Sequence, residues 1–268
     1  MQKRKQVILL QKLIEVRNIT KSFGKTKPKQ VLDDVSIDIK KRKILGLLGE
    51  TGSGKTTLAK HIIGLYSPDS GEIFLENKKV KDLKKRKFED CAKIQYIFQD
   101  PYSAMDEYLL VEDILLEPFN ICKKYKHKNF LTPKKAMSTI GIDDYDNWRY
   151  KKIATLSGGQ RQKVCIARAL VPCPKLLIAD ESTSMLDKAS TKEILEILKQ
   201  LKNKNKISIL LISHQINVIK KICDDIAILN NAKIIETGKT NEIINNPKKD
   251  YTKELIECMD LFSEEMEE

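Results

Sequence analysis

The chain has 268 residues, of which 41% are apolar and 32% are charged, and its formal net charge is +12. This composition is typical of a globular protein whose core is large enough to fold without disulfides, and six cysteines without C-x-x-C spacing indicate reduced thiols in a cytosolic protein. No apolar run approaches the roughly 18–20 residues that span a bilayer, and the run at 7–10 is too short for a secretory signal.

The first hundred residues predict strands around one helix. Alternating apolar residues indicate strands at 12–20 and 31–39, joined by a loop at 25–30. The expected elements that follow are a short buried strand at 44–48, a helix at 55–65, a turn at 67–71, and strands at 73–75 and 94–98.

Residues 100–155 change character, because their apolar residues have helical spacing with interruptions expected at Pro118 and Pro133. The elements expected after this helical insert are a helix at 159–171, a strand at 176–180, an amphipathic helix at 188–201 and a strand at 207–213. The two strands are continuous apolar runs, as in a parallel sheet that is covered on both faces, and strand–helix alternation predicts an α/β fold.

One segment matches the phosphate-loop pattern G-x-x-x-x-G-K-S/T, directly after a buried strand and at a helix start. Its residues are Gly49, Glu50, Thr51, Gly52, Ser53, Gly54, Lys55 and Thr56, and Thr57 follows them. Backbone N–H groups and the helix N-terminus would face the phosphates of ATP, Lys55 would neutralise them, and the Thr56 hydroxyl would bind Mg²⁺. The alternative is a chance glycine-rich turn, which the complete pattern and its context disfavour.

A hydrophobic strand at 176–180 ends in two carboxylates, Asp180 and Glu181. Asp180 at the strand end can hold the hydration shell of Mg²⁺, and Glu181 is then placed to polarise the attacking water. A strand that ends in Asp-Glu is weak evidence alone, but it becomes strong beside a phosphate loop.

A second anion site is predicted at Ser157-Gly158-Gly159-Gln160, which opens a helix after the insert. Leu156 to Gln160 is similar to the signature of the ATP-binding-cassette (ABC) family, and the chain resembles that family over nearly its whole length. The resemblance implies that Gln99 senses Mg²⁺ and the membrane subunit, that Asp187 lies in a loop at a dimer interface, and that His214 contacts the γ-phosphate. It also implies that Phe23 stacks on adenine, although Phe23 could equally be a core residue.

Within the family, the flanks at 96–104 and 222–227 and the closing segment at 246–255 resemble the dipeptide, oligopeptide and nickel importers. One segment and two single positions depart from that pattern. Met105-Asp106-Glu107-Tyr108 stands where Asn-Pro-Arg is usual, Ser182 replaces a proline, and Gln215 replaces an aspartate. The changes at Ser182 and Gln215 remove no reacting group, whereas the change at 105–108 affects how the helical insert meets its membrane partner.

The resemblance implies one nucleotide-binding domain over 1–268, with a RecA-like parallel-sheet core and an N-terminal antiparallel β-subdomain at about 12–98 and 172–268, and a helical subdomain at 99–171. It implies an ATPase that binds ATP and Mg²⁺ in a head-to-tail dimer with itself or a paralogue. Transmembrane permease subunits and an external substrate-binding protein would complete a prokaryotic importer, with this chain on the cytoplasmic face of the membrane.

The alternative is a soluble ABC ATPase that acts on nucleic acid, on the ribosome or on an assembly complex. The lysine-rich segments at 81–87 and 123–128 are its main support. No aromatic residues interleave with these lysines in a stacking pattern, so a solvated surface is preferred and no nucleic-acid partner is expected. A small-molecule P-loop kinase would explain neither the signature nor His214.

Overall fold

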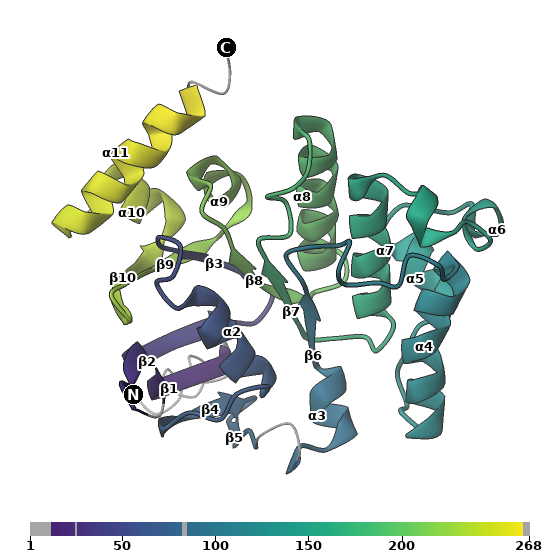
Figure 1. Cartoon of the computed structure of the whole chain (residues 1–268), viewed down its shortest axis with the longest axis horizontal. Helices are drawn as coiled ribbons and strands as arrows, with labels where there is room; N and C mark the ends of the chain where they lie inside the picture. The colour runs from purple at the N-terminus through teal and green to yellow at the C-terminus, as the bar shows by residue number, and fades with distance from the viewer. Residues whose placement is uncertain (1–11, 25, 82–84, 265–268) are drawn as a thin grey trace, which may run out of the picture. The chain divides into compact units, whose positions relative to one another are not determined.

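The computed structural model divides into two compact units (Figure 1). Unit 1 takes Met1–Arg86 and Ser208–Glu268, and unit 2 takes Lys87–Ile207. The described residues are 12–24, 26–81 and 85–264. The apolar run at 7–10 and the middle of the lysine-rich segment at 81–87 therefore lie outside the described residues.

Unit 1 contains two sheets and the helices that follow their strands. Its elements in chain order are β1 (Lys12–Phe23), β2 (Lys29–Lys40), β3 (Ile44–Leu48), α2 (Lys55–Ile63), β4 (Ser70–Leu75), β5 (Lys78–Lys79), β8 (Ser208–Ile212), α9 (Ile216–Ile222), β9 (Asp225–Asn230), β10 (Lys233–Lys239), α10 (Thr240–Asn245) and α11 (Asp250–Glu264).

The first sheet of unit 1 is antiparallel, with the strand order β2-β1-β4-β5. In the second sheet β3 lies between β8 and β9 and runs parallel to both, while β10 pairs antiparallel with β9. Strands β3 and β8 are buried at every position, because their continuous apolar sequences suit strands covered on both faces. The antiparallel β-subdomain and the parallel strands predicted from the sequence are both present.

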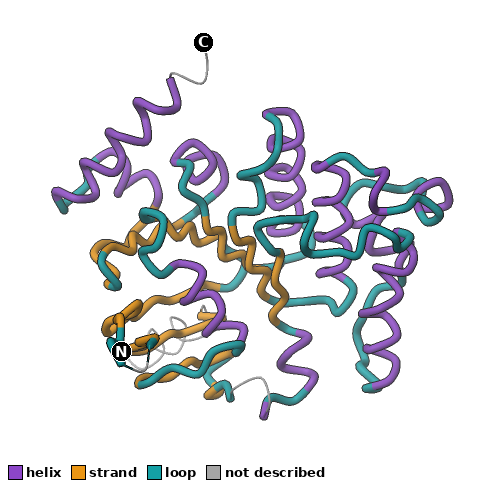
Figure 2. The backbone as a smooth tube through the Cα atoms, in the orientation of Figure 1, coloured by secondary structure: helices purple, strands orange, loops and turns teal. Residues whose placement is uncertain are grey.

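Unit 2 is mainly helical (Figure 2). Its elements in chain order are α3 (Phe88–Ala92), β6 (Ile94–Ile97), α4 (Val111–Lys124), α5 (Pro133–Thr139), α6 (Tyr145–Trp148), the 3₁₀ helix η2 (Ile153–Thr155), α7 (Gly158–Leu170), β7 (Leu176–Asp180) and α8 (Lys188–Asn203). Strands β6 and β7 pair in parallel, so the two segments that end in Gln99 and in the Asp180–Glu181 pair run side by side.

The predicted interruption at Pro118 is wrong, because α4 continues through it. A proline inside a helix removes a hydrogen bond and strains the preceding turn, at a cost of about 3 kcal/mol. Helix α4 offsets this cost by burying Ile114 and Leu115 on one face, with acidic residues in its first turn and lysines in its last. Pro133, by contrast, begins α5, where a missing N–H costs nothing.

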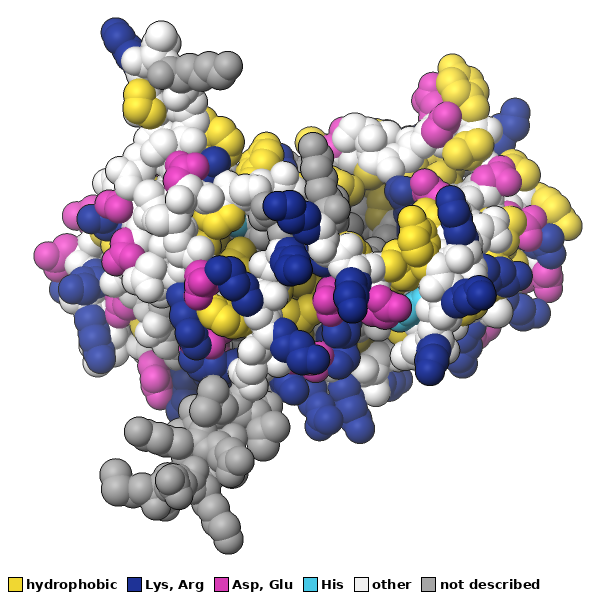
Figure 3. Space-filling view, turned by 90° about the horizontal axis from the view of Figure 1, so that it is seen from below, with side chains coloured by type: hydrophobic (Ala, Val, Ile, Leu, Met, Phe, Trp, Pro, Cys, Tyr) yellow, Lys and Arg dark blue, Asp and Glu magenta, His cyan; other side chains and the backbone are white. Residues whose placement is uncertain are grey.

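The charged surface is mixed in sign. Lys and Arg side chains lie among acidic and hydrophobic ones over the face in Figure 3. Several lysines are paired, such as Lys21 with Asp69 at 2.6 Å and Lys163 with Glu193 at 2.6 Å. Across the ranges that the structure describes, no helix is both long and apolar enough to cross a membrane.

Candidate functional site

The loop between β3 and α2 has a backbone that only glycine adopts easily. Gly49, Gly52 and Gly54 have φ values of +152°, +83° and +111°. A Cβ atom on Gly49 would lie 2.1 Å from the carbonyl oxygen of Leu229, and one on Gly54 would lie 2.6 Å from that of Val31. The loop is therefore closely packed against β9 and β2, and Gly49 and Gly54 are required by both conformation and space, whereas Gly52 is required by conformation alone.

Polar groups of this loop suit a phosphate chain. The Lys55 side chain is 5% exposed, and its Nζ donates to the carbonyl oxygens of Gly49 at 2.8 Å and Glu50 at 2.7 Å. Helix α2 has no acidic residue in its first turn, so the positive potential of its N-terminus is unopposed. Ser53 Oγ is buried without a hydrogen-bond partner among the described residues. These observations fit an anionic ligand such as a nucleotide phosphate.

Phe23 ends β1 in the same unit and is 39% exposed, which is inconsistent with the alternative that it is a core residue. The Phe23 and Tyr66 rings make an edge-to-face contact, with centroids 5.4 Å apart and an interplanar angle of 69°. Lys21 Nζ lies 5.5 Å from the centroid of the Phe23 ring. An exposed ring supported in this way can stack on a base, and that role stays a prediction. Sequence reasoning did not identify Tyr66.

His214 follows β8 and precedes α9, and it is exposed. Its neighbour Gln215 donates its backbone N–H to Ser213 Oγ at 3.0 Å, which turns the chain between strand and helix. The predicted contact of His214 with a γ-phosphate is not tested by this arrangement.

The two carboxylates after β7 have different surroundings within unit 2. Asp180 is 3% exposed and accepts a short hydrogen bond from the hydroxyl of Tyr96 on β6. Burial and the neighbouring Asp180 carboxylate raise the pKa of Tyr96, so its hydroxyl stays a donor. Glu181 is less buried and accepts a hydrogen bond on Oε2 from Gln99 Nε2 at 2.7 Å.

Glu181 also has a left-handed backbone, with a φ of +45°. Such a conformation is unusual for a residue with a side chain, and it is found at functional sites. The Ser184 hydroxyl and backbone N–H both donate to the Glu181 carbonyl, at 2.9 Å and 3.1 Å, and hold this turn. The next residue, Ser182, has a buried hydroxyl with no hydrogen-bond partner among the described residues.

The predicted second anion site begins α7. Ser157 Oγ accepts from the backbone N–H of Gln160 at 3.3 Å, and Gln160 Oε1 accepts from that of Ser157 at 3.1 Å. This reciprocal capping fixes the start of the helix. A Cβ atom on Gly159 would lie 2.5 Å from Ser190 Oγ, so α7 and α8 approach closely at this point.

Asp187 caps the start of α8 and hydrogen-bonds to Ser190, the residue that lies against Gly159. Its carboxylate accepts from Ser190 Oγ at 2.7 Å and from the Ser190 backbone N–H at 2.8 Å. These two hydrogen bonds lower the pKa of Asp187, the side-chain bond more than the backbone bond. The structure thus joins the signature helix to Asp187 through Ser190, which sequence reasoning did not single out.

The predicted site residues fall into two groups, one in each unit. Unit 1 holds Phe23, residues 49–57 and His214. Unit 2 holds Gln99, residues 157–160, Asp180, Glu181 and Asp187.

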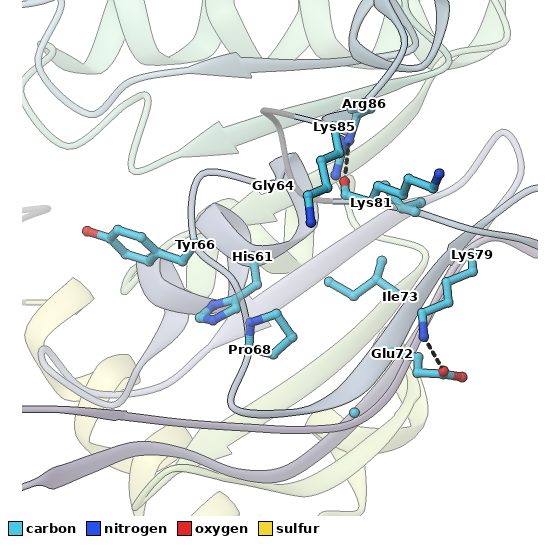
Figure 4. Close-up of a pocket in the computed structure, with 12 residues that line it drawn as sticks. His61, Gly64, Tyr66, Pro68, Glu72, Ile73, Lys79, Lys81, Lys85 and Arg86 are labelled. Atoms are coloured by element: carbon cyan, nitrogen blue, oxygen red, sulfur yellow. Dashed lines mark hydrogen bonds and ion pairs between the residues drawn. The ribbon is translucent and has the colours of Figure 1, made fainter.

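A pocket of about 410 Å³ lies at the opposite end of α2 from the phosphate loop (Figure 4). His61 and Tyr66 contribute to one side of it, and Lys79, which pairs with Glu72, to another. Arg86 also lines it and donates from Nε to the Lys81 carbonyl at 3.0 Å. Although several cations surround this pocket, it lies at the negative end of the helix dipole and is not where a phosphate chain would meet α2.

A glycine loop of this shape, placed between a buried parallel strand and a helix that begins with lysine, defines a P-loop nucleotide-binding protein. Residues 32–184 match the family described as ABC transporter. The chain belongs to the ABC transporter family.

Curated relatives are similar over most of the chain. The oligopeptide transport ATP-binding protein OppF of Streptococcus mutans is 36% identical over 253 residues, 92% of this chain and 82% of the relative. OppF of Bacillus subtilis is 34% identical, over 94% of this chain and 84% of its own length. The methionine import ATP-binding protein MetN of Clostridioides difficile is 38% identical, over 86% of this chain and 70% of the relative.

Solved structures share the fold. The dimeric ATP-binding cassette MJ0796, in a post-hydrolysis state with ADP and Pi, has a TM-score of 0.71 at 25% identity. The match covers 85% of this chain and 98% of the MJ0796 chain. The structure of cbiO1 from Clostridium perfringens has a TM-score of 0.75 at 24% identity and matches 96% of this chain and 100% of its own. The α/β P-loop fold, the ABC family and the class of ATP-hydrolysing enzyme predicted from the sequence are confirmed.

Proposed function

We propose that this chain is the ATP-binding and ATP-hydrolysing subunit of an ABC importer that takes up oligopeptides. The observation that carries the proposal is the similarity to oligopeptide transport ATP-binding proteins over more than nine-tenths of the chain. The curated relatives reported above are named for oligopeptides and for methionine, so a peptide is preferred to nickel or a metal chelate as the cargo. No observation favours the soluble alternative.

Binding of ATP is assigned to the phosphate loop and its flanks. Backbone N–H groups at 49–54 and the N-terminus of α2 would hold the β-phosphate, with the Lys55 ammonium beside the β- and γ-phosphates. Thr56, Gln99 and Asp180 are the side chains proposed to hold Mg²⁺, which when bound neutralises charge on the phosphate oxygens. Phe23 would stack on the adenine.

Hydrolysis is assigned to Glu181, with Gln99 and His214 beside the reacting phosphate. Glu181 would accept a proton from the attacking water, and Gln99, which donates to Glu181 Oε2, keeps that carboxylate oriented. We propose that residues 157–160 and Asp187 serve the nucleotide held by a second cassette, which is either this chain or a paralogue. Each site would then be complete only in a head-to-tail dimer.

Coupling to the membrane is assigned to Gln99 and the helical segment that follows it, within the proposed helical subdomain at 99–171. The remaining partners proposed are transmembrane permease subunits and an external substrate-binding protein, with this chain on the cytoplasmic face of a prokaryotic cell membrane. Exposed Tyr102 and Tyr108 would be available for contact with a permease helix, and Met105 to Tyr108 would alter the details of that contact.

The experiment is to co-express the chain with candidate permease, second ATPase and binding-protein genes from the same genome. Purified complex in lipid vesicles should hydrolyse ATP faster when binding protein loaded with an oligopeptide is added. Glu181→Gln should keep ATP binding and lower turnover by roughly 10²- to 10⁴-fold, because the general base is lost. Turnover that ignores peptide but responds to methionine or nickel would contradict the peptide assignment, and failure to associate with any permease would contradict the importer.

A further inference from the structure

The first turn of α11 reaches the phosphate loop. The hydroxyl of Tyr251, the second residue of α11, donates a hydrogen bond to Glu50 Oε1 at 3.2 Å, across 201 residues of sequence. Both residues belong to unit 1. Tyr251 lies in the closing segment at 246–255, which resembles that of the peptide and nickel importers but received no role in the sequence analysis.

Glu50 is held by contacts at both its carbonyl and its carboxylate. Its carbonyl oxygen accepts from Lys55 Nζ at 2.7 Å and from the backbone N–H of Ser53 at 3.2 Å. Its carboxylate accepts from Tyr251. Because side chain and carbonyl share one Cα atom, restraint of the carboxylate also restrains the carbonyl that positions the Lys55 ammonium.

Tyr251 is itself fixed by the second sheet of unit 1. Glu236 on β10 is 8% exposed, and its two carboxylate oxygens accept from the backbone N–H groups of Lys248 at 3.0 Å and Lys249 at 3.3 Å. Helix α11 also buries Leu255 and Ile256. The start of α11 is therefore anchored on both sides of Tyr251. These contacts hold in place the backbone from which the Tyr251 side chain reaches Glu50.

The Tyr251 hydroxyl is a donor at neutral pH. Its burial, followed by the negative charge of Glu50, raises the pKa of Tyr251 to about 12, and a backbone hydrogen bond from Glu50 acts in the opposite direction. A neutral phenol beside a carboxylate keeps the proton that the hydrogen bond needs.

We propose that Tyr251 is a positioning residue of the nucleotide site, which holds the phosphate loop through Glu50. The closing segment of the chain thereby becomes part of the ATP site without touching the ATP. This inference rests on the proposed role of the loop in binding ATP.

The test is Tyr251→Phe, which removes only the hydroxyl and keeps the ring. The dissociation constant of MgATP, measured by calorimetry on the full chain, should rise roughly two- to tenfold, the range that one hydrogen bond supplies. In the assembled transporter KM for ATP should rise while kcat stays unchanged, because the residues assigned to hydrolysis are intact. A tyrosine with a purely structural role would not produce this division between KM and kcat.

Two further variants make the test specific. Glu50→Ala, which removes the acceptor, should also weaken MgATP binding, and the double variant Tyr251→Phe/Glu50→Ala should bind no more weakly than Glu50→Ala alone, because both changes remove one interaction. Tyr125→Phe is the matched control, since Tyr125 is 54% exposed and stacks on Phe88 with centroids 4.7 Å apart. It should bind MgATP like the wild type.

An unchanged dissociation constant for Tyr251→Phe, in a wild-type background that binds MgATP, would overturn this inference and leave the proposed function standing. Additive effects of the two substitutions would also overturn it, because they would show that Tyr251 acts by another route. If the wild-type chain and its assembled transporter bound no ATP, the proposed function and this inference would both fall.

Discussion

At the scale of single residues, hydrogen-bond partners distinguish the two carboxylates after β7. Asp180 is buried and one of its oxygens is occupied by the Tyr96 hydroxyl, whereas Glu181 is less buried and accepts from the Gln99 amide. A buried carboxylate whose position is fixed by a phenol hydrogen bond suits a cation's hydration shell. A more exposed carboxylate oriented by an amide suits the activation of water.

Tyr96→Phe tests this division. It withdraws the donor from a buried carboxylate oxygen, so the free energy of unfolding should fall by about 1–3 kcal/mol. Binding of ATP without Mg²⁺ should not change, but the gain in ATP affinity on adding Mg²⁺ should shrink several-fold, because Asp180 is less firmly held. Fluorescent-nucleotide titrations with and without Mg²⁺ measure the ATP affinity in the absence of Mg²⁺ and the gain in affinity that Mg²⁺ supplies. Tyr150→Phe, at a tyrosine that is 66% exposed, is the control. An unaltered Mg²⁺ effect would show that Tyr96 serves stability alone.

Sequence patterns singled out the residues to which we assign the reaction, but not the residues that hold them in place. Lys55, Asp180 and Glu181 were predictable because each belongs to a short contiguous pattern. Tyr96 is 84 residues from Asp180 and Tyr251 is 201 residues from Glu50, so no local pattern joins either pair. Only the pairing of β6 with β7, and the anchoring of α11 on β10, bring them together.

At the scale of elements, the phosphate loop depends on what β9 places behind it. Gly49 and Gly52 both have positive φ values, but a Cβ atom on Gly52 would meet no atom within 4 Å, whereas one on Gly49 would lie 2.1 Å from the Leu229 carbonyl. A side chain at Gly52 would therefore suffer only the conformational strain of a positive φ, whereas one at Gly49 would also collide with β9.

The matched variants Gly52→Ala and Gly49→Ala measure the cost of the conformational strain and the added cost of the steric contact. Gly52→Ala should destabilise the chain by about 1–2 kcal/mol, the cost of a left-handed alanine. Gly49→Ala should cost clearly more and abolish MgATP binding, because the loop must move off β9. Chemical denaturation and calorimetry check both results. Equal losses of stability in the two variants would mean that the contact with Leu229 does not constrain the loop.

Sequence patterns predicted some elements better than others for a physical reason. The buried runs of β3, β7 and β8 and the amphipathic face of α8 have clear apolar patterns, and they were found close to their bounds. Strands β9 and β10 were not identified. Strand β9 has only four fully buried residues, and the apolar sequence of β10 is interrupted by Thr237 and Gly238. Neither strand therefore shows a sustained pattern of apolar residues. Helix α4 was wrongly interrupted because burial of its apolar face outweighs the cost of Pro118.

At the scale of the whole molecule, the proposed dimer requires that Lys55 and Ser157 of one chain serve different nucleotides. Lys55 is in unit 1 and Ser157 is in unit 2. If two copies of this chain pair head to tail, each ATP meets the phosphate loop of one copy and the signature of the other. Lys55→Ala and Ser157→Arg should therefore each abolish hydrolysis when present in both copies, although Ser157→Arg chains should still bind ATP.

Mixing the two variants tests the arrangement. A mixed dimer of Lys55→Ala and Ser157→Arg chains contains one site with both defects and one site with neither, so hydrolysis should partly return in membranes that contain the permease. If Lys55 and Ser157 served the same nucleotide within one chain, every site would carry a defect and mixing would restore nothing. A paralogue as the natural partner would also prevent rescue in this mixture. The control is therefore Ser157→Arg in this chain combined with a phosphate-loop lysine substitution in the paralogue, which again leaves one intact site. Absence of hydrolysis in both mixtures, with both wild-type pairs active, would contradict a nucleotide site shared between two cassettes.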